Sequence, residues 1–129
     1  MQKLAERTMA LALAVVAVAL CAIAYHITQR DRLPDTGTPY QAVALMNGQL
    51  FFGKLDTAAG GYLVLRDVFY VQTRQNPDTK AVANVLVKRG GEAHGPDRMV
   101  LNRQQVLLVE PVKADSQIGK LIAEQQQAR

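Results

Sequence analysis

The sequence predicts a mainly β protein: an N-terminal transmembrane helix, a small strongly bent β-barrel, and a short C-terminal helix. Three observations support this fold class. An uninterrupted apolar segment lies near the N-terminus, short apolar runs separated by turn residues follow it, and a capped amphipathic stretch comes last. A chain of 129 residues has room for one small domain besides the apolar segment.

The first element is the apolar segment Met9–Ile27. It contains no Lys, Arg, Asp, Glu, Gly or Pro, and its length matches the hydrocarbon core of a bilayer crossed as a helix. A small soluble domain cannot bury a helix that is apolar all round. We therefore predict that residues 1–29 form an N-terminal tail and a membrane anchor.

A cleaved signal peptide is the alternative interpretation of this segment. The N-terminus is basic, and Ala22–Ala24 has the small-residue pattern of a cleavage site. The apolar stretch is longer than a usual signal core and continues past that site, which favours an uncleaved signal anchor. Cys21 follows Leu20 rather than a small residue, which argues against a lipoprotein.

Basic residues lie on both sides of the anchor. Lys3 and Arg7 precede it, and Arg30 and Arg32 follow it. Short basic N-terminal tails stay in the cytoplasm, so we expect a single-pass membrane protein with its C-terminal domain outside. If the cell is a Gram-negative bacterium, the anchor lies in the inner membrane and the domain lies in the periplasm. The similar charge on the two sides leaves the opposite orientation open.

Composition beyond the anchor narrows the range of functions. From Asp31 onward, 12 Lys and Arg stand against 10 Asp and Glu, a net charge of +2, which is small for a nucleic-acid-binding surface. Cys21 is the only cysteine, so we expect neither a disulfide nor a cysteine zinc site. With no P-loop, dinucleotide fingerprint or metal-binding spacing, we expect no cofactor, no small-molecule substrate and no catalysis.

The predicted domain opens with a hairpin after a polar linker at 30–39. Asn47-Gly48 is a strong hairpin signal, because both residues tolerate the positive φ angles of a type I′ turn. Tyr40–Met46 should then pair with Gln49–Asp56. Gly53 lies inside the second strand, where glycine marks a sharp bend or a close backbone approach.

The remaining strands are predicted from β-branched and aromatic content between turn signals. They are Tyr62–Thr73, Ala81–Arg89, Met99–Leu101 and Val106–Val109, with loops at Thr57–Gly61, Arg74–Lys80, Gly90–Asp97 and Asn102–Gln105. In the second of these strands, Val82, Val85 and Val87 should be buried. The strands make residues 40–112 the barrel domain.

Residues 113–129 are predicted to be a helix and a tail. Ser116 is a suitable N-cap, and Ile118, Leu121 and Ile122 recur along one side at helical spacing.

Four segments of the chain resemble the Sm/LSm family. Val43–Gly48, Phe52–Leu55 and Leu63–Val68 resemble the first half of the Sm barrel signature, and Met99–Glu110 is similar to the second half. This resemblance implies an Sm-like (SH3-like) barrel. The whole sequence also resembles a family of small, uncharacterised bacterial single-pass membrane proteins, through the phrases at Asn47–Leu55, His94–Asn102 and Gln105–Leu107.

Two departures from the Sm pattern concern function. RNA-binding Sm proteins carry an Asp-x-x-Met-Asn-like loop and an Arg-Gly pair. This chain has Asp56–Leu63 in the first place, without the asparagine, and Asn102-Arg103 in the second. The resemblance therefore supports the barrel and does not imply RNA binding.

Two groups of residues are candidates for function. The aromatic residues Phe51, Phe52, Phe69 and Tyr70 are expected to supply a protein interface. A possible functional loop contains His94, Asp97, Arg98, Asn102 and Arg103, although a lone histidine with scattered carboxylates is more typical of an exposed loop than of a metal site or a general base. Asp67 alternates with apolar residues, and we expect it to cap a turn or to pair with an arginine.

The leading hypothesis is a membrane-anchored, non-catalytic binding or assembly module of the bacterial cell envelope. It would act through protein–protein contacts, as a homo-oligomer or with a membrane-protein partner, because open strand edges and aromatic surface favour such contacts. The alternative is a membrane-tethered Sm-like nucleic-acid-binding protein that faces the cytoplasm.

Overall fold

The computed structural model describes residues 1–30, 33–59 and 61–128, which belong to two compact units. The units are residues 1–33 and 34–129. The predicted linker at 30–39 and the predicted turn at Thr57–Gly61 include residues 31–32 and Gly60, which lie outside the described residues. The terminal Arg129 lies outside them as well.

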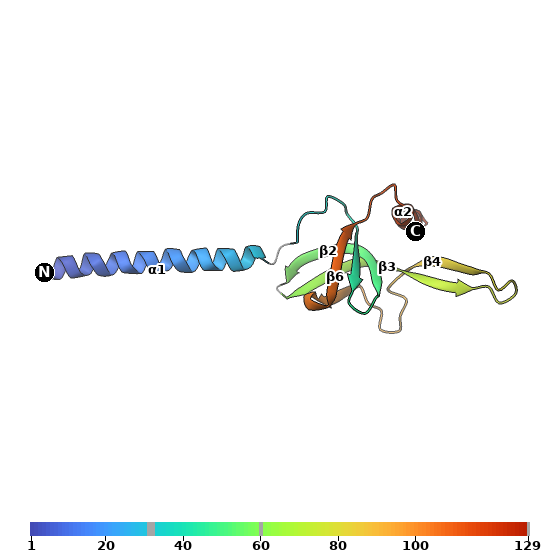
Figure 1. Cartoon of the computed structure of the whole chain (residues 1–129), viewed down its shortest axis with the longest axis horizontal. Coiled ribbons are helices and arrows are strands. Elements are labelled where there is room, and N and C mark those ends of the chain that lie inside the picture. Colours follow the sequence, from blue (N-terminus) through green and yellow to red (C-terminus); the bar gives the residue numbers. More distant parts are fainter. Residues whose placement is uncertain (31–32, 60, 129) are drawn as a thin grey trace. The chain divides into compact units, whose positions relative to one another are not determined.

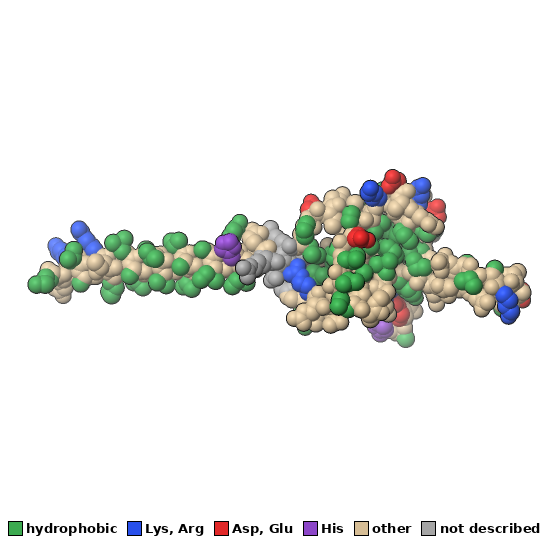
Figure 2. Space-filling model, in the orientation of Figure 1, with side chains coloured by type: hydrophobic (Ala, Val, Ile, Leu, Met, Phe, Trp, Pro, Cys, Tyr) green, Lys and Arg blue, Asp and Glu red, His purple; other side chains and the backbone are tan. Residues whose placement is uncertain are grey.

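The first unit is one long helix, α1, which spans Gln2–Arg30 (Figure 1). Apolar side chains are exposed along its whole length (Figure 2), and the helix is long and apolar enough to cross a membrane. Near its ends, the hydroxyl groups of Thr8 and Thr28 donate to the carbonyls of Leu4 and Ala24, at 3.1 Å each. These bonds satisfy polar side chains within the helix, as an apolar environment requires.

The second unit is a six-stranded antiparallel sheet with one short helix (Figure 1). Five strands follow the order β4-β3-β2-β1-β6, and β5 pairs with the N-terminal part of β3. The elements are β1 Gln41–Leu45, β2 Leu50–Ala59, β3 Tyr62–Gln75, β4 Val82–Lys88, β5 Arg98–Asn102, the 3₁₀ turn η1 Arg103–Gln105, β6 Val106–Pro111 and α2 Gln117–Gln127. All six predicted strand segments are therefore present, although their bounds shift by a few residues.

The sheet is not closed into a barrel. Within the described residues, β6 pairs only with β1, and neither β4 nor β5 pairs with β6. The mainly antiparallel β architecture is confirmed, whereas closure of the sheet stays a prediction.

The first hairpin differs from the predicted type I′ turn. The amide of Leu45 donates to the carbonyl of Gln49 at 2.9 Å, and the amide of Gly48 donates to the carbonyl of Leu45 at 3.0 Å. Gly48 alone in this turn has a positive φ, 85°, and the Asn47 side chain accepts the amide of Gln49 at 3.0 Å. The connection is therefore a three-residue loop, which shifts the pairing of the strands by one residue from the predicted register.

Both faces of the sheet carry buried side chains. One face packs against α2, with a cluster of Tyr40, Ala42, Phe52, Phe69, Leu86, Val112 and Ile122. Side chains on the opposite face are also buried, among them Val43, Phe51, Leu63, Leu65 and Leu101. Strands that are apolar on both faces are expected in a domain with two layers of core.

The helix α2 begins where the sequence predicts. The side-chain oxygen of Ser116 accepts the amide of Gly119 at 3.0 Å, which satisfies one of the free N–H groups at the helix start. Gly119 is required here, because a β-carbon would collide with the carbonyl oxygen of Lys113. Ile122 is buried, and Ile118 and Leu121 pack beside it, as the helical spacing indicates.

The hairpin formed by β3 and β4 extends beyond the sheet as a two-stranded ribbon (Figure 1). All side chains from residue 71 to residue 85 are exposed; we call this segment the arm. The predicted burial of Val82 and Val85 is wrong, since they are 64% and 37% exposed, and Val87 is only half-buried. The physical reason is the absence of a third described strand or helix beside the arm, so that only Leu86, which reaches the α2 face, is buried.

Candidate functional site

A β-bulge between β2 and β3 positions a cluster of charged side chains. The pairing of β2 with β3 shifts between Phe52 and Lys54, so that Asp67 and Val68 together face Gly53. Asp67 has a φ of 49°, in the left-handed region that aspartate tolerates better than most residues. A β-carbon on Gly53 would lie 2.7 Å from Leu65 Cγ, so the close approach expected at this glycine is confirmed.

The bulge directs the carboxylate of Asp67 toward two lysines on the neighbouring strands. Asp67 Oδ2 lies 3.0 Å from Lys54 Nζ, and Asp67 Oδ1 lies 3.4 Å from Lys88 Nζ. The hydrogen bond from Lys54 lowers the pKa of Asp67, and the same bond raises the pKa of Lys54. The predicted pairing with an arginine is therefore wrong: the partners are lysines from β2 and β4.

Aromatic rings and glutamines connect this cluster to α2. Lys54 Nζ lies 5.4 Å from the centre of the Tyr40 ring, and Gln126 donates a hydrogen bond to the Tyr40 hydroxyl. Burial raises the pKa of that hydroxyl. Gln125 donates to the carbonyl of Leu86 at 2.7 Å, so that both glutamines attach the C-terminal end of α2 to the sheet.

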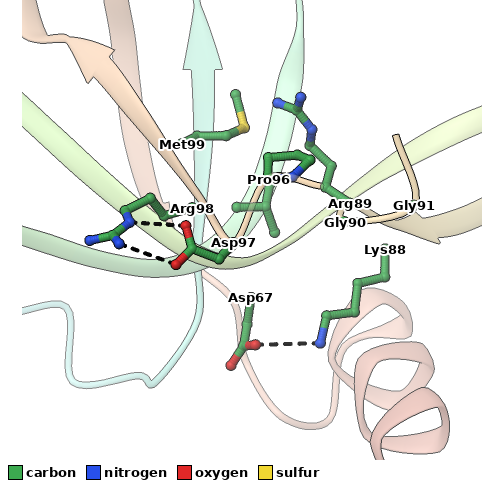
Figure 3. Close-up of a pocket in the computed structure, with 10 residues that line it drawn as sticks. Asp67, Lys88, Arg89, Gly90, Gly91, Pro96, Asp97, Arg98 and Met99 are labelled. Atoms are coloured by element: carbon green, nitrogen blue, oxygen red, sulfur yellow. Dashed lines mark hydrogen bonds and ion pairs between the residues drawn. The ribbon is translucent and has the colours of Figure 1, made fainter. Parts of the chain in front are cut away.

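A pocket of about 480 Å³ lies beside the cluster, between the end of β4 and the start of β5 (Figure 3). Its walls are formed by Asp67, Val68, Lys88, Arg89, Gly90, Gly91, Pro96, Asp97, Arg98 and Met99. Figure 3 shows Asp67 pointing toward Lys88, and Arg98 pointing toward Asp97 at 3.0 Å. The hydrogen bond from Arg98 lowers the pKa of Asp97.

The loop that follows β4 is held by one more ion pair. Arg89 Nε donates to Glu92 Oε1 at 2.7 Å, and the amide of Gly90 donates to Glu92 Oε2 at 2.8 Å. These two bonds, with the Gly90 bond the stronger influence, lower the pKa of Glu92 to about 2. All three cations that border the pocket therefore have carboxylate partners.

A second pocket of about 590 Å³ shares Arg89 and Met99 with the first. It is mainly apolar and is lined by the hairpin turn and by β3, with Gly48, Gln49, Leu50, Phe51, Tyr70, Val71 and Glu92 as its other residues. The loop from Arg89 to Met99 thus separates a charged pocket from an apolar one.

The structure divides the predicted functional loop into two parts. Asp97 and Arg98 line the charged pocket at the start of β5, whereas Asn102 and Arg103 lie at its far end. Asn102 caps the 3₁₀ turn there by accepting the amide of Gln104 at 3.0 Å. His94 is exposed in the loop and lines neither pocket.

Three of the four predicted interface aromatics lie in the core. Phe51, Phe52 and Phe69 are 9%, 6% and 0% exposed, so they do not offer an exposed aromatic surface. Tyr70 is half-buried, and its ring meets that of Phe51 edge-on with centroids 6.5 Å apart. Where a strand has apolar residues on both faces, the sequence does not show whether one face or both are covered. It therefore does not assign these aromatic residues to the core or to the surface.

The residues that line the pocket are paired charges and apolar side chains. In residues 1–30, 33–59 and 61–128, no group of three or more His, Cys, Asp or Glu is placed to hold a metal ion. The carboxylates at the pocket accept hydrogen bonds from cations, and no hydroxyl or thiol nucleophile lines it. A ligand in the pocket would contact paired charged side chains and the apolar side chains of Val68 and Met99.

The sequence alone did not reveal the Lys54–Asp67–Lys88 cluster. Lys88 is 21 residues from Asp67, and their contact depends on the register of two strand pairs. The only local signal was an aspartate among apolar strand residues, which indicated that Asp67 needs a partner. A comparison with protein-family models and a search of curated proteins find no match to this chain.

Proposed function

We propose that this protein is a membrane-anchored, non-catalytic binding module of the bacterial cell envelope that acts through protein–protein contacts. The anchor is α1, and the binding unit is the β domain, which we propose to be an Sm-like barrel. Support for that fold comes from the strand order, in which the last strand β6 pairs with the first, and from the 3₁₀ turn between β5 and β6. The proposal includes the location of the protein: the anchor crosses the inner membrane, and the β domain lies in the periplasm.

The arm is the observation that carries the proposal. A two-stranded ribbon is marginally stable by itself in water, because it lacks a third strand or a packed face. β3 and β4 form seven consecutive residue pairs, and the four from Gln72↔Val85 to Gln75↔Val82 lie within the arm. The arm exposes Val71, Val82 and Val85. An exposed ribbon with apolar side chains and unpaired strand edges is suited to β-augmentation by a partner.

The hydrogen-bonding pattern identifies the open edge of the arm. The amide of Arg89 donates to the carbonyl of Val68, and the amide of Asn76 donates to the carbonyl of Ala81. The backbone N–H and C=O groups of the odd-numbered residues of β4 therefore bond to β3, and those of the even-numbered residues point away from β3. The outward carbonyl of Leu86 is already occupied by Gln125. The open part of the β4 edge is therefore the outer part, from Val82 to Val85.

Site-specific crosslinking in native membranes tests this proposal. A photoreactive amino acid at Val82, in the arm, should give a discrete crosslinked protein species from the full-length chain. Leu107 is the matched control, because it is 63% exposed and Val82 is 64% exposed, yet Leu107 lies on β6 outside the arm. Equal crosslinking at the two positions, or none at Val82, would contradict a binding role for the arm.

A topology reporter separates this function from the nucleic-acid alternative. A reporter fused after Arg129 should be active in the periplasm, where a protein-binding envelope module would work. Activity in the cytoplasm would remove the periplasmic assignment and would favour the membrane-tethered nucleic-acid binder.

A further inference from the structure

Three cations lie side by side across three strands of the sheet. Lys54 of β2 faces Arg66 of β3, and Arg66 faces Arg98 of β5. Directly opposed residues point to the same face, with Cβ atoms about 4.5–5.5 Å apart. Leu65, next to Arg66 on β3, and Leu101, three residues beyond Arg98 on β5, are buried on one face of the sheet. The row therefore lies on the other face, which is the face that α2 covers farther along the sheet, at Phe52 and Phe69.

The middle cation of the row lacks the partner that each outer cation has. Lys54 is bonded to Asp67. Arg98 is bonded to Asp97, as Figure 3 shows. The side chain of Arg66 forms no hydrogen bond or ion pair within the described part of the chain, and its positive charge contributes to the lowered pKa of Asp97. Like charges that are directly opposed across strands destabilise a sheet, and an anion bound at Arg66 would remove that cost.

The surroundings of the row limit what such an anion can be. Arg98 and Lys54 have side chains that are each 48% exposed, so the site is open to large as well as small ligands. Tyr62 and Val100 are exposed on the same face at 56% and 59%. Asp56 also lies on this face, opposite Val64, which favours a single anionic group near Arg66 over a long polyanion.

We infer that Lys54, Arg66 and Arg98 form a binding site for a phosphate group. A guanidinium can hold two phosphate oxygens at once, and the flanking cations are placed to contact the third. Either a phospholipid headgroup or a free phosphate ester could supply the group. The headgroup is within reach, because α1 ends at Arg30 and β1 begins at Gln41, and such a connection spans at most about 40 Å.

The test uses the full-length chain with ¹⁵N-labelled arginine, in nanodiscs of phosphatidylcholine alone or with added phosphatidylglycerol. The Arg66 side-chain NMR signal should shift on addition of inorganic phosphate, on inclusion of the anionic lipid, or on both. A shift with phosphate alone identifies a free-phosphate site, and a shift with the lipid alone identifies a headgroup site. No shift under either condition would overturn the inference.

Two variants separate a specific site from general attraction of anions. Arg66→Gln should weaken binding of the probe that shifts the Arg66 signal, whether phosphate or anionic lipid, about ten-fold or more. The reason is that the substitution removes a charge-assisted hydrogen-bonding partner. Arg74→Gln, which removes one exposed arginine from the arm, should leave binding unchanged; equal losses in the two variants would overturn the inference. Arg66→Gln should also leave the unfolding temperature without phosphate unchanged or raised, which distinguishes lost binding from misfolding.

Discussion

The two halves of β3 have the same secondary structure and very different surroundings. Its N-terminal half, Tyr62–Tyr70, pairs with β2 along one edge and, along the other edge, with β5 at Tyr62–Arg66 and with β4 at Phe69 and Tyr70. In this half of β3, Leu63, Leu65 and Phe69 are at most 1% exposed. Its C-terminal half, 71–75, pairs only with β4 and is exposed at every position. The comparison shows that β-forming residues make the strand, whereas burial depends on which other elements lie beside it.

The bulge marks the region where β3 is covered on both sides. Val68 and Phe69 are consecutive, yet both are buried, at 4% and 0% exposed. Consecutive strand residues point to opposite faces, so both faces have a covering layer at this point. Two residues further on, Val71 is 43% exposed, because it lies at the start of the arm.

The largest effect is expected from truncation of Phe69 in the covered half of β3. Phe69→Ala should lower the free energy of unfolding by about 3–5 kcal/mol, because it leaves a cavity in the core. Val71→Ala is the matched change in the arm and should stay within about 0.5 kcal/mol. Urea unfolding of the full-length chain in detergent, followed by circular dichroism, measures both; similar losses would mean that the arm is packed as firmly as the sheet.

A second test concerns the close approach at the bulge. Gly53→Val should destabilise the protein by about 1–3 kcal/mol, because the new side chain would meet Leu65 and the carbonyl of Arg66, which lies 2.8 Å from a β-carbon at this site. Gly91→Ala serves as the control, since a β-carbon there has no neighbour within 4 Å. A Gly53→Val protein with unchanged unfolding would contradict the bulge geometry.

The smallest effect concerns the charge of Asp67. The pKa of Asp67 is lowered in the folded protein from the unfolded value near 3.8. The ionised carboxylate therefore stabilises the folded state above the unfolded pKa, and this stabilisation is lost as the pH falls through the lower pKa of the folded state. Asp67→Asn keeps a residue that tolerates positive φ, and should cost up to about 1 kcal/mol at pH 7, the range for exposed ion pairs. The difference between the unfolding curves of the two proteins should shrink as the pH falls below 3.8; a constant difference at all pH values would exclude the ion pairs as the cause.

Local sequence signals predicted most elements correctly. The apolar run predicted α1, alternating apolar residues predicted the strands, and Ser116 marked the start of α2. The glycine in the middle of β2 indicated a close backbone approach, which Gly53 makes to β3. Each of these features depends on a few neighbouring residues, whose conformational preferences act before any tertiary contact forms.

The functional surfaces could not be predicted in the same way. The sequence placed Phe51, Phe52 and Phe69 at an interface and Val82 and Val85 in the core, and the structure places the three aromatics in the core and the two valines on the surface. Period-2 alternation defines two faces of a strand, but it does not state which faces are covered.

The sequence by itself therefore determined an apolar helix, a set of antiparallel strands and a capped C-terminal helix. Only the tertiary structure decided the bulge that gives Asp67 its two lysines, the exposure of the arm, and the row of Lys54, Arg66 and Arg98. These features join residues far apart in the chain through strand register. A shift of one residue in register moves a whole set of side chains to the other face, and the register depends on turns and bulges that form together with the packed sheet.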